Sequence, residues 1–471
     1  MEGLTVKKWL FVFLILVVCL ILSAAAEEKN GTYNPRYYDY ILLDDGTVEI
    51  VGYTGREKEL RIPDNLGGFT VTSIGERAFY GCYTLKSVMI PESITSIGDY
   101  AFSSCEDLVS VVIPDSVINM GANPFMNCEN LNYIELSPNN ERFSNIHGVL
   151  FENAAKKLVC YPLTLNDSIY IIPEGTLAIG DSAFTNCDML KSVTIPDGVI
   201  SIGGDAFANC DSLVSVKIPD GVTSIGTGAF SWCRSIASVI IPDSVTTIGE
   251  GVFYECRDLV SVNIPDGITA VEGYMFAYCY SLSSITIPDS VTMIGTSSFT
   301  DCDSLSSISI SDAVNFIGDY AFYGCNKLTS VVIPDSVNVI GKSVFANCTS
   351  LISVTLSDGI TSISEGTFKM CDSLTSIKIS DSVTTIGYEA FVYCDALTAV
   401  TIPDSVNYIE ERAFALCKSL TSVIIPDSVT FIGDGAFIGS NKAVLMVGAD
   451  SYAEKWAIEN NIRYTLADSG R

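Results

Sequence analysis

Residues 213–233 read LVSVKIPDGVTSIGTGAFSWC, and the same frame returns along most of the 471-residue chain. Its isoleucine-proline step, or an equivalent, marks fifteen units. The marker residues are Ile62, Ile90, Ile113, Ile172, Ile195, Ile218, Ile241, Ile264, Ile287, Ile310, Ile333, Leu356, Ile379, Ile402 and Ile425. From Ile172 onward the spacing is 23 residues without a slip. A fixed short period of this kind predicts a repeat solenoid, in place of the roughly three domains that the length alone would suggest.

Within the unit, apolar Val216 and Ile218 alternate with polar neighbours, which indicates a short strand with one buried face. Pro219 lacks a backbone donor and ends that strand, and 229–233 is expected to form one helical turn. A unit this short cannot bury its apolar face alone, so it must stack on its neighbours. We therefore predict a mainly β, right-handed solenoid of leucine-rich-repeat type, with short parallel strands and about 15 rungs of 23 residues, capped at both ends. One side-chain column is expected to form a phenylalanine seam, with Phe79, Phe102, Phe207, Phe230, Phe253 and Phe276 among its members.

Breaks in the period divide the chain. The spacing between Cys128 and Cys187 is 59 residues, which is two periods and 13 residues more. Inside this break, 148–151 and 157–161 are predicted to pair as a two-stranded hairpin. The expected divisions are a signal peptide at 1–26, an N-terminal cap with the start of the first rung at 27–75, repeats at 76–136, a β-hairpin insertion at 137–171, twelve contiguous repeats at 172–442, and a C-terminal cap with a short helix at 443–471.

The first 26 residues have the pattern of a secretory signal. Lys7 and Lys8 precede an apolar run at 9–22, and small residues at 23–26 supply a cleavage site before Glu27. The alternative is a membrane anchor, but the run of 14 residues is shorter than the ~20 needed to span a bilayer. We expect a secreted or cell-surface protein that is not inserted in the membrane after cleavage.

The charge of the chain limits the classes of partner that it is expected to bind. It has 26 basic and 55 acidic residues, for a net charge of −29. Such a surface repels nucleic acid and anionic lipid, so neither is an expected partner. An extracellular protein or a glycan is expected instead, and nothing in the sequence predicts oligomerisation beyond a monomer.

Fourteen of the sixteen cysteines occupy one repeat position, from Cys82 to Cys417. The short spacings of a zinc site do not occur. Equivalent residues on neighbouring rungs lie about 4.8 Å apart, longer than the ~3.8 Å between the Cβ atoms of a disulfide. We therefore predict a thiol ladder in the core, with no metal and no disulfide framework.

A second column is acidic in every unit, and we call it the acidic ladder. Its central members are Asp197, Asp220, Asp243, Asp266, Asp289, Asp312 and Asp335. Carboxylates stacked at about 5 Å repel one another. One interpretation is that each accepts backbone N–H bonds within its own Pro-Asp-Ser/Gly turn. The other is that calcium or a cationic partner binds along the ladder, although calcium prefers six to eight oxygen ligands.

Aromatic residues outside the core pattern are the candidates for recognition. They fall one or two positions after the repeat phenylalanine and change from rung to rung. The six candidates are Tyr80, Trp232, Tyr254, Tyr278, Tyr323 and Tyr393. They either cover the turns as scattered side chains or form a patch that binds a protein or a glycan.

The repeated motif Ile-Pro-Asp-Ser/Gly-Val-x-x-Ile-Gly-x-x-Ala-Phe-x-x-Cys-x-x-Leu, together with 146–150 in the insertion and 451–454 near the end, resembles the BspA-type (Treponema-type) leucine-rich repeat proteins. The resemblance covers residues from about 40 to 466. It implies a surface-exposed or secreted protein linked to adhesion, without catalytic residues.

The residues themselves give little support to catalysis. The single histidine, His147, lies in the insertion, so no Ser/His/Asp arrangement recurs in the repeats. The ladder carboxylates share one environment, whereas acid-base catalysis needs two with different pKa values. We therefore predict no enzyme and no catalytic residue, and weigh two functions: protein–protein interaction or adhesion, and extracellular glycan binding through the surface aromatics.

Overall fold

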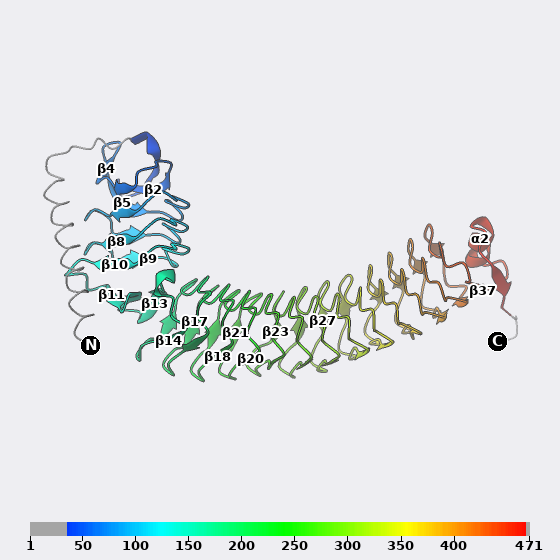
Figure 1. The fold of residues 1–471 in the computed structure, drawn as a ribbon. Coiled ribbons are helices and arrows are strands. Elements are labelled where there is room, and N and C mark those ends of the chain that lie inside the picture. Colours follow the sequence, from blue (N-terminus) through cyan, green and yellow to red (C-terminus); the bar gives the residue numbers. More distant parts are fainter. Residues whose placement is uncertain (1–34, 468–471) are drawn as a thin grey trace.

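The computed structural model describes residues 35–467 of the chain. Stacked rungs form two arms that meet at a sharp bend near β13 and β14, with the blue-to-cyan arm N-terminal and the green-to-red arm C-terminal (Figure 1). The predicted fold class, a mainly β solenoid of short parallel strands with little helix, is confirmed. The predicted signal peptide at 1–26 lies outside the described residues.

Each regular rung contributes strands to two parallel columns. In the first column, equivalent residues pair across 23 positions, as Ser215 does with Ser238 and Val216 with Val239. This column contains β3 (Glu59–Arg61), β6 (Ser87–Met89), β8 (Ser110–Ile113), β10 (Tyr133–Leu136), β14 (Ile169–Ile171), β16 (Ser192–Thr194), β18 (Ser215–Lys217), β20 (Ser238–Ile240), β22 (Ser261–Val262), β24 (Ser284–Thr286), β26 (Ser307–Ser309), β28 (Ser330–Val332), β30 (Ser353–Thr355), β33 (Ala399–Thr401), β35 (Ser422–Ile425), β37 (Leu445–Val447) and β38 (Tyr464–Leu466).

The second column follows the Val-x-x-Ile step of each unit, where the isoleucine is buried. Its parallel strands are β2 (Val48–Tyr53), β5 (Phe69–Ile74), β7 (Ser96–Ile97), β9 (Asn119–Met120), β13 (Lys157–Cys160), β15 (Ala178–Ile179), β17 (Ser201–Ile202), β19 (Ser224–Ile225), β21 (Thr247–Ile248), β23 (Ala270–Val271), β25 (Met293–Ile294), β27 (Phe316–Ile317), β29 (Val339–Ile340), β31 (Ser362–Ile363), β32 (Thr385–Ile386), β34 (Tyr408–Ile409) and β36 (Phe431–Ile432). Three antiparallel strands extend it outside the regular units: β1 (Tyr38–Leu42) beside β2, and β11 (Phe143–Ile146) and β12 (Val149–Glu152) in the insertion. The short β4 (Asn65–Leu66) pairs with β5, and two 3-10 turns, η1 (Pro35–Tyr37) and η2 (Leu163–Leu165), complete the irregular parts.

The segment that closes each unit is a series of tight turns, so the predicted helical turn is wrong. In one rung Ser231 N–H donates to the Gly228 carbonyl at 2.8 Å, and Cys233 N–H donates to the Phe230 carbonyl at 3.3 Å. The amide of Phe230 instead reaches the Val252 carbonyl of the next rung at 3.0 Å. A helix would need its amides for bonds within the segment, but stacking uses alternate amides, those of Phe230 and Trp232, for bonds to the next rung.

The phenylalanine seam is confirmed. Phe207 and Phe230, for example, have ring centroids 5.3 Å apart and are nearly parallel, with 1° between their planes. Aromatic residues of the caps extend the seam at both ends: Tyr53 lies 5.2 Å from Phe79, and Trp456 lies 6.0 Å from Phe437. The caps thereby cover apolar rings that an open solenoid end would expose to water.

The insertion contains three antiparallel strands, where the sequence predicted two. The expected pair is β12 and β13, and β11 adds a strand on the other side of β12. Side chains alternate between two cores: Val149 and Phe151 belong to the core of the C-terminal arm, whereas Leu150 and Val159 belong to the core of the N-terminal arm. Both faces of this small sheet are therefore buried, and it forms a wall between the arms.

On the turn side, the two arms contact each other directly across the insertion. Asn123 Nδ2 donates to the Ser182 carbonyl at 2.7 Å, and Tyr100 Oη lies 3.2 Å from Ser182 Oγ. Asn186 Nδ2 also donates to Asn127 Oδ1. Side chains thus replace the backbone ladder at this junction, while the inserted strands separate the arms elsewhere, which accounts for the bend (Figure 1).

The C-terminal cap contains α2 (Tyr452–Glu459), which is the α-helix of the described residues. Ser451 caps it, because its Oγ accepts the Glu454 amide at 3.1 Å. After the helix, β38 pairs in parallel with β37 and closes the first column.

Candidate functional site

Three of the six aromatic residues predicted for recognition lie together on consecutive rungs. The rings of Trp232 and Tyr254 are 5.6 Å apart, and those of Tyr254 and Tyr278 are 5.4 Å apart, both in edge-on contact. Tyr280 extends the group at 6.3 Å from Tyr278. We call these four residues the aromatic patch. All four side chains are partly exposed to solvent.

The rung-to-rung hydrogen bonds position this patch. Trp232 and Tyr278 have left-handed backbones, with φ of +61° and +62°, a conformation that costs a non-glycine residue about 1–2 kcal/mol. Their amides donate to the carbonyls of Tyr254 and Thr300, each at 2.7 Å. Because stacking fixes the backbone here, the side chain can vary while the conformation does not.

Two arginines stack on the patch. The guanidinium carbon of Arg234 lies 5.0 Å from the ring centre of Trp232, and that of Arg257 lies 5.7 Å from the ring centre of Tyr280. Such contacts favour a cation over an aromatic face. The patch and the two arginines over it therefore bring together tryptophan, tyrosine and arginine, the residues enriched at the energetic centres of protein interfaces.

Carboxylates beside the patch orient both guanidinium groups. Arg234 Nη1 lies 2.6 Å from Asp211 Oδ2, and Arg257 Nε lies 2.8 Å from Glu255 Oε2. Glu255 is itself 7% exposed, so its bond to Arg257 satisfies a buried charge. Ion pairs with one exposed partner add little stability, and the main effect of these two is to hold the planar groups in place.

The tyrosine hydroxyls of the patch stay protonated at neutral pH. Burial is the main cause that raises the pKa of Tyr254, Tyr278 and Tyr280. Nearby carboxylates act in the same direction, with Asp301 next in importance at Tyr278 and Glu255 next at Tyr280. Each hydroxyl can therefore both donate and accept a hydrogen bond.

The other three predicted aromatics do not extend this contact chain of rings. Tyr80 lies in the N-terminal arm and is 56% exposed, and Tyr393 is 38% exposed near the far end. Tyr323 contacts Tyr320, with ring centres 6.1 Å apart. Sequence reasoning missed Tyr280 and the two arginines of the patch.

The seven central carboxylates of the acidic ladder are all exposed. Where the structure gives them a hydrogen bond, the donor lies in the following rung, not in their own turn as expected. Ser311 Oγ donates to Asp289 Oδ1 at 2.7 Å, and the Asp358 amide donates to Asp335 Oδ1 at 3.1 Å. An amide within the turn, that of Val222, is taken by the Pro219 carbonyl at 3.1 Å.

Within residues 35–467, no group of three or more His, Cys, Asp or Glu side chains is arranged to hold a metal ion. Calcium binding along the acidic ladder stays a prediction.

The cysteines of the described residues are free thiols, and all but Cys82 are buried. The thiol of Cys233 donates to the Phe207 carbonyl of the preceding rung at 3.0 Å, a bond that most of the ladder repeats. Burial raises the pKa of Cys348 and Cys417 to about 12. The Cys348 and Cys417 thiols are therefore protonated at neutral pH, and the carbonyl bonds of the ladder help to join the rungs.

Comparison with protein families identifies the repeat. The description "BspA type leucine rich repeat region (6 copies)" matches residues 57–165, 157–283, 223–351, 269–398 and 315–444. The chain belongs to this family of BspA-type leucine-rich repeat proteins. Comparison with curated proteins gives no match.

Solved structures are similar as well. A leucine-rich repeat protein from Bacteroides ovatus is 27% identical, with a TM-score of 0.57, and the match covers 93% of this chain and all of that one. A leucine-rich cell surface protein from Faecalibacterium prausnitzii is 26% identical over 92% of this chain and 98% of its own, with a TM-score of 0.37. Of these two, the first supports the likeness in overall fold.

The comparisons and the structure each bear on one expectation drawn from the sequence. The family and the matched folds are non-enzymatic repeat proteins. Among residues 35–467, no helix has the length and apolar character to cross a bilayer.

Proposed function

We propose that this protein is secreted or displayed at the cell surface and binds a partner protein through the aromatic patch. The observation that carries the proposal is the unbroken contact of four rings and two arginines across neighbouring rungs. Membership of a leucine-rich repeat family supports a role in protein interaction. The basic, apolar and small-residue pattern of 1–26 supports export.

The geometry favours a protein over a glycan. Sugars bind aromatic side chains by stacking on an open ring face. Arg234 lies over Trp232 and Arg257 lies over Tyr280, so one face of each ring is already used. Edge-on contacts among the remaining rings leave mixed aromatic and hydroxyl surface, which suits the polar and apolar groups of a protein.

A paired array experiment tests this function. Purified protein would be applied to a protein array and to a glycan array, and hits would be measured again with a Trp232→Ala, Tyr278→Ala double variant. We expect saturable binding to a protein, weakened by tenfold or more in the double variant, because buried aromatic anchors at interfaces contribute about 2 kcal/mol or more each.

The matched control is Tyr393→Ala. Tyr393 has the same repeat position and the same φ of +62° as Tyr278, but lies outside the patch. Its loss should leave affinity unchanged, although it removes the same side chain at the same repeat position as the Tyr278→Ala substitution does. Equal weakening by both variants, or a glycan as the sole saturable ligand, contradicts the proposal.

A further inference from the structure

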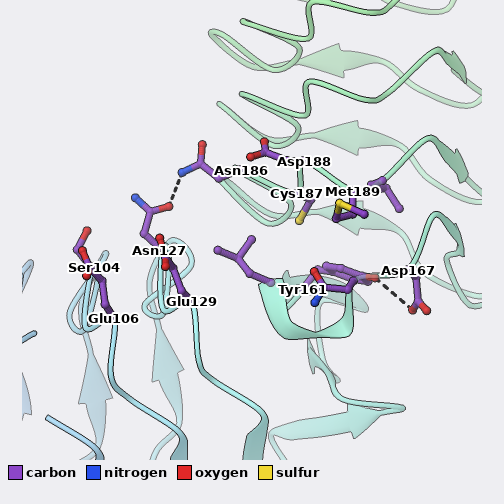
Figure 2. A pocket seen from close by; sticks show the side chains of 13 residues that line it. Ser104, Glu106, Asn127, Glu129, Tyr161, Asp167, Asn186, Cys187, Asp188 and Met189 are labelled. Carbon is purple, nitrogen blue, oxygen red and sulfur yellow. Dashed lines mark hydrogen bonds between the residues drawn. The ribbon is translucent and has the colours of Figure 1, made fainter. Parts of the chain in front are cut away.

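A cavity of about 570 Å³ lies at the bend, between the rung that ends at Cys128 and the rung that ends at Cys187. A regular rung would place a Phe-x-x-Cys turn between these two. The insertion instead continues from Tyr161 through Pro162 into η2, so that turn is missing. Figure 2 shows the result: side chains from both arms and from the insertion surround an open space.

The cavity has an apolar floor and an acidic rim. Tyr161 and Leu190 are buried at its base. The rim carries four exposed carboxylates, two from the N-terminal arm, one from the insertion and one from the C-terminal arm. They are Glu106, Glu129, Asp167 and Asp188. Among the described residues, no lysine or arginine lines the cavity or forms an ion pair with these four.

The thiol of Cys187 gives an independent sign that the cavity is unfilled. This side chain is 6% exposed and points toward the cavity (Figure 2). From Cys105 to Cys417, the other ladder thiols each donate to a phenylalanine carbonyl, whereas the structure gives Cys187 no such acceptor. The Cys187 side chain is hydrogen-bonded to that of Cys210 in the next rung instead, so the carbonyl acceptor usual in this column is missing on the cavity side.

Glu106 and Glu129 lie on one side of the cavity and Asp167 and Asp188 on others, so the rim carboxylates do not converge on one point (Figure 2). Asp167 is further held by the Tyr161 hydroxyl, which donates to its Oδ2 at 3.2 Å. An extended ligand with more than one cation matches this spacing. Lysine and arginine also carry apolar stems that can lie along an apolar floor while their charged ends reach a polar rim.

We propose that this elbow cavity binds a basic segment of a partner protein, with lysine or arginine side chains bridging the rim carboxylates of the two arms. The site uses none of the residues of the aromatic patch and does not rest on the function proposed above. It would let one chain contact a partner at two places, at the bend and along the C-terminal arm.

Calorimetry with the tripeptide acetyl-Lys-Lys-Lys-amide tests the proposal on the whole chain. Physiological ionic strength is used, because screening over about 8 Å then suppresses attraction to the diffuse negative surface. We expect saturable binding at one site. The double variant Glu129→Gln, Asp188→Asn should weaken it by about tenfold or more, since each bond to a charged group is worth about that factor.

The control variant removes the same charge elsewhere. Asp220→Asn, Asp243→Asn alters two exposed carboxylates of the acidic ladder and should change affinity by less than about twofold, as expected for screened charges. The Trp232→Ala, Tyr278→Ala variant should bind the tripeptide normally, which separates this site from the aromatic patch. Equal weakening by the two charge variants, or no saturable binding to the unaltered chain, overturns the proposal.

A second readout locates the peptide. Met189 lines the cavity and is 57% exposed, whereas Met370 is 39% exposed on a distant rung. With carbon-13 labelled methionine methyl groups, the peptide should shift the Met189 resonance and leave that of Met370 unchanged. A shift confined to Met370, or shifts of equal size at both residues, rules out the cavity as the binding site.

Discussion

The hydroxyl of Ser440 donates to the Phe414 carbonyl at 2.7 Å, and the thiol of Cys417 donates to the Phe391 carbonyl at 3.1 Å one rung earlier. Serine therefore makes the same inter-rung bond in the last unit that cysteine makes in most of the others. The repeat position requires a small buried hydrogen-bond donor, and the role of that donor is to join neighbouring rungs.

Replacing Ser440 tests this interpretation. Ser440 also accepts the Cys417 amide at 2.9 Å and is 5% exposed. Ser440→Ala leaves both partners unpaired in the core, so the free energy of unfolding should fall by about 1–3 kcal/mol. Ser440→Cys restores a donor and should cost less. Denaturation followed by circular dichroism compares them, and an alanine variant as stable as the cysteine variant contradicts the role assigned to the bond.

The thiol ladder also predicts a loss of stability at alkaline pH. Burial raises the pKa of Cys348 and Cys417 to about 12 in the folded chain, whereas an unfolded thiol ionises near 8.5. Their contribution to stability is complete below about pH 8.5 and is lost as the pH rises toward 12. Above pH 8.5 each such thiol should lower the free energy of unfolding by up to about 1.4 kcal/mol per pH unit.

Melting temperatures between pH 8 and 9.5 measure this effect, because tyrosines ionise mainly at higher pH. A triple variant, Cys302→Ser, Cys325→Ser, Cys348→Ser, should lose stability less steeply over the same range. Equal slopes in the two proteins would show that the ladder thiols are not the titrating groups.

The hydrogen bonds at the junction of the arms lead to a separate prediction about stability and shape. Asn123 is 4% exposed, and its Nδ2 donates to the Ser182 carbonyl at 2.7 Å across the insertion. Asn123→Ala should reduce the free energy of unfolding by about 1–3 kcal/mol, because a buried carbonyl loses its donor. Exposed Asn130, whose Nδ2 bonds the Glu106 carbonyl at 2.9 Å, is the control. X-ray scattering would show whether the angle between the arms changes; a stable Asn123 variant of unaltered shape would contradict the account of this junction.

The repeat could be predicted from the sequence because side chains that stack on neighbouring rungs must be of the same type, and they therefore recur at a fixed spacing. Phe230 and Cys233 recur at fixed spacing, and the structure places both in columns joined across rungs. The insertion occurs once, so no equivalent segment elsewhere in the chain can be compared with it. Phe143–Ile146 was missed as a strand because it pairs antiparallel within a segment that occurs once.

The composition of the aromatic patch could be predicted only in part. Trp232, Tyr254 and Tyr278 follow the repeat phenylalanine, at positions that change from rung to rung. Arg234 and Tyr280 occupy the position after the repeat cysteine, and aligning that column across units would have shown the arginine and tyrosine residues together. Contact between the two columns depends on the left-handed turns, which no local pattern indicates for tryptophan or tyrosine.

The central claim is that recognition lies in the variable side chains of the patch, while the repeated positions build the scaffold. Hydroxyl-radical footprinting with a bound partner protein tests it most directly, because oxidation reports the exposure of individual side chains. Oxidation of Trp232, Tyr254, Tyr278 and Tyr280 should fall in the complex, and that of exposed Tyr80 and Tyr408 should not change. Protection of Tyr80 or Tyr408 with unchanged oxidation of the patch would contradict the claim.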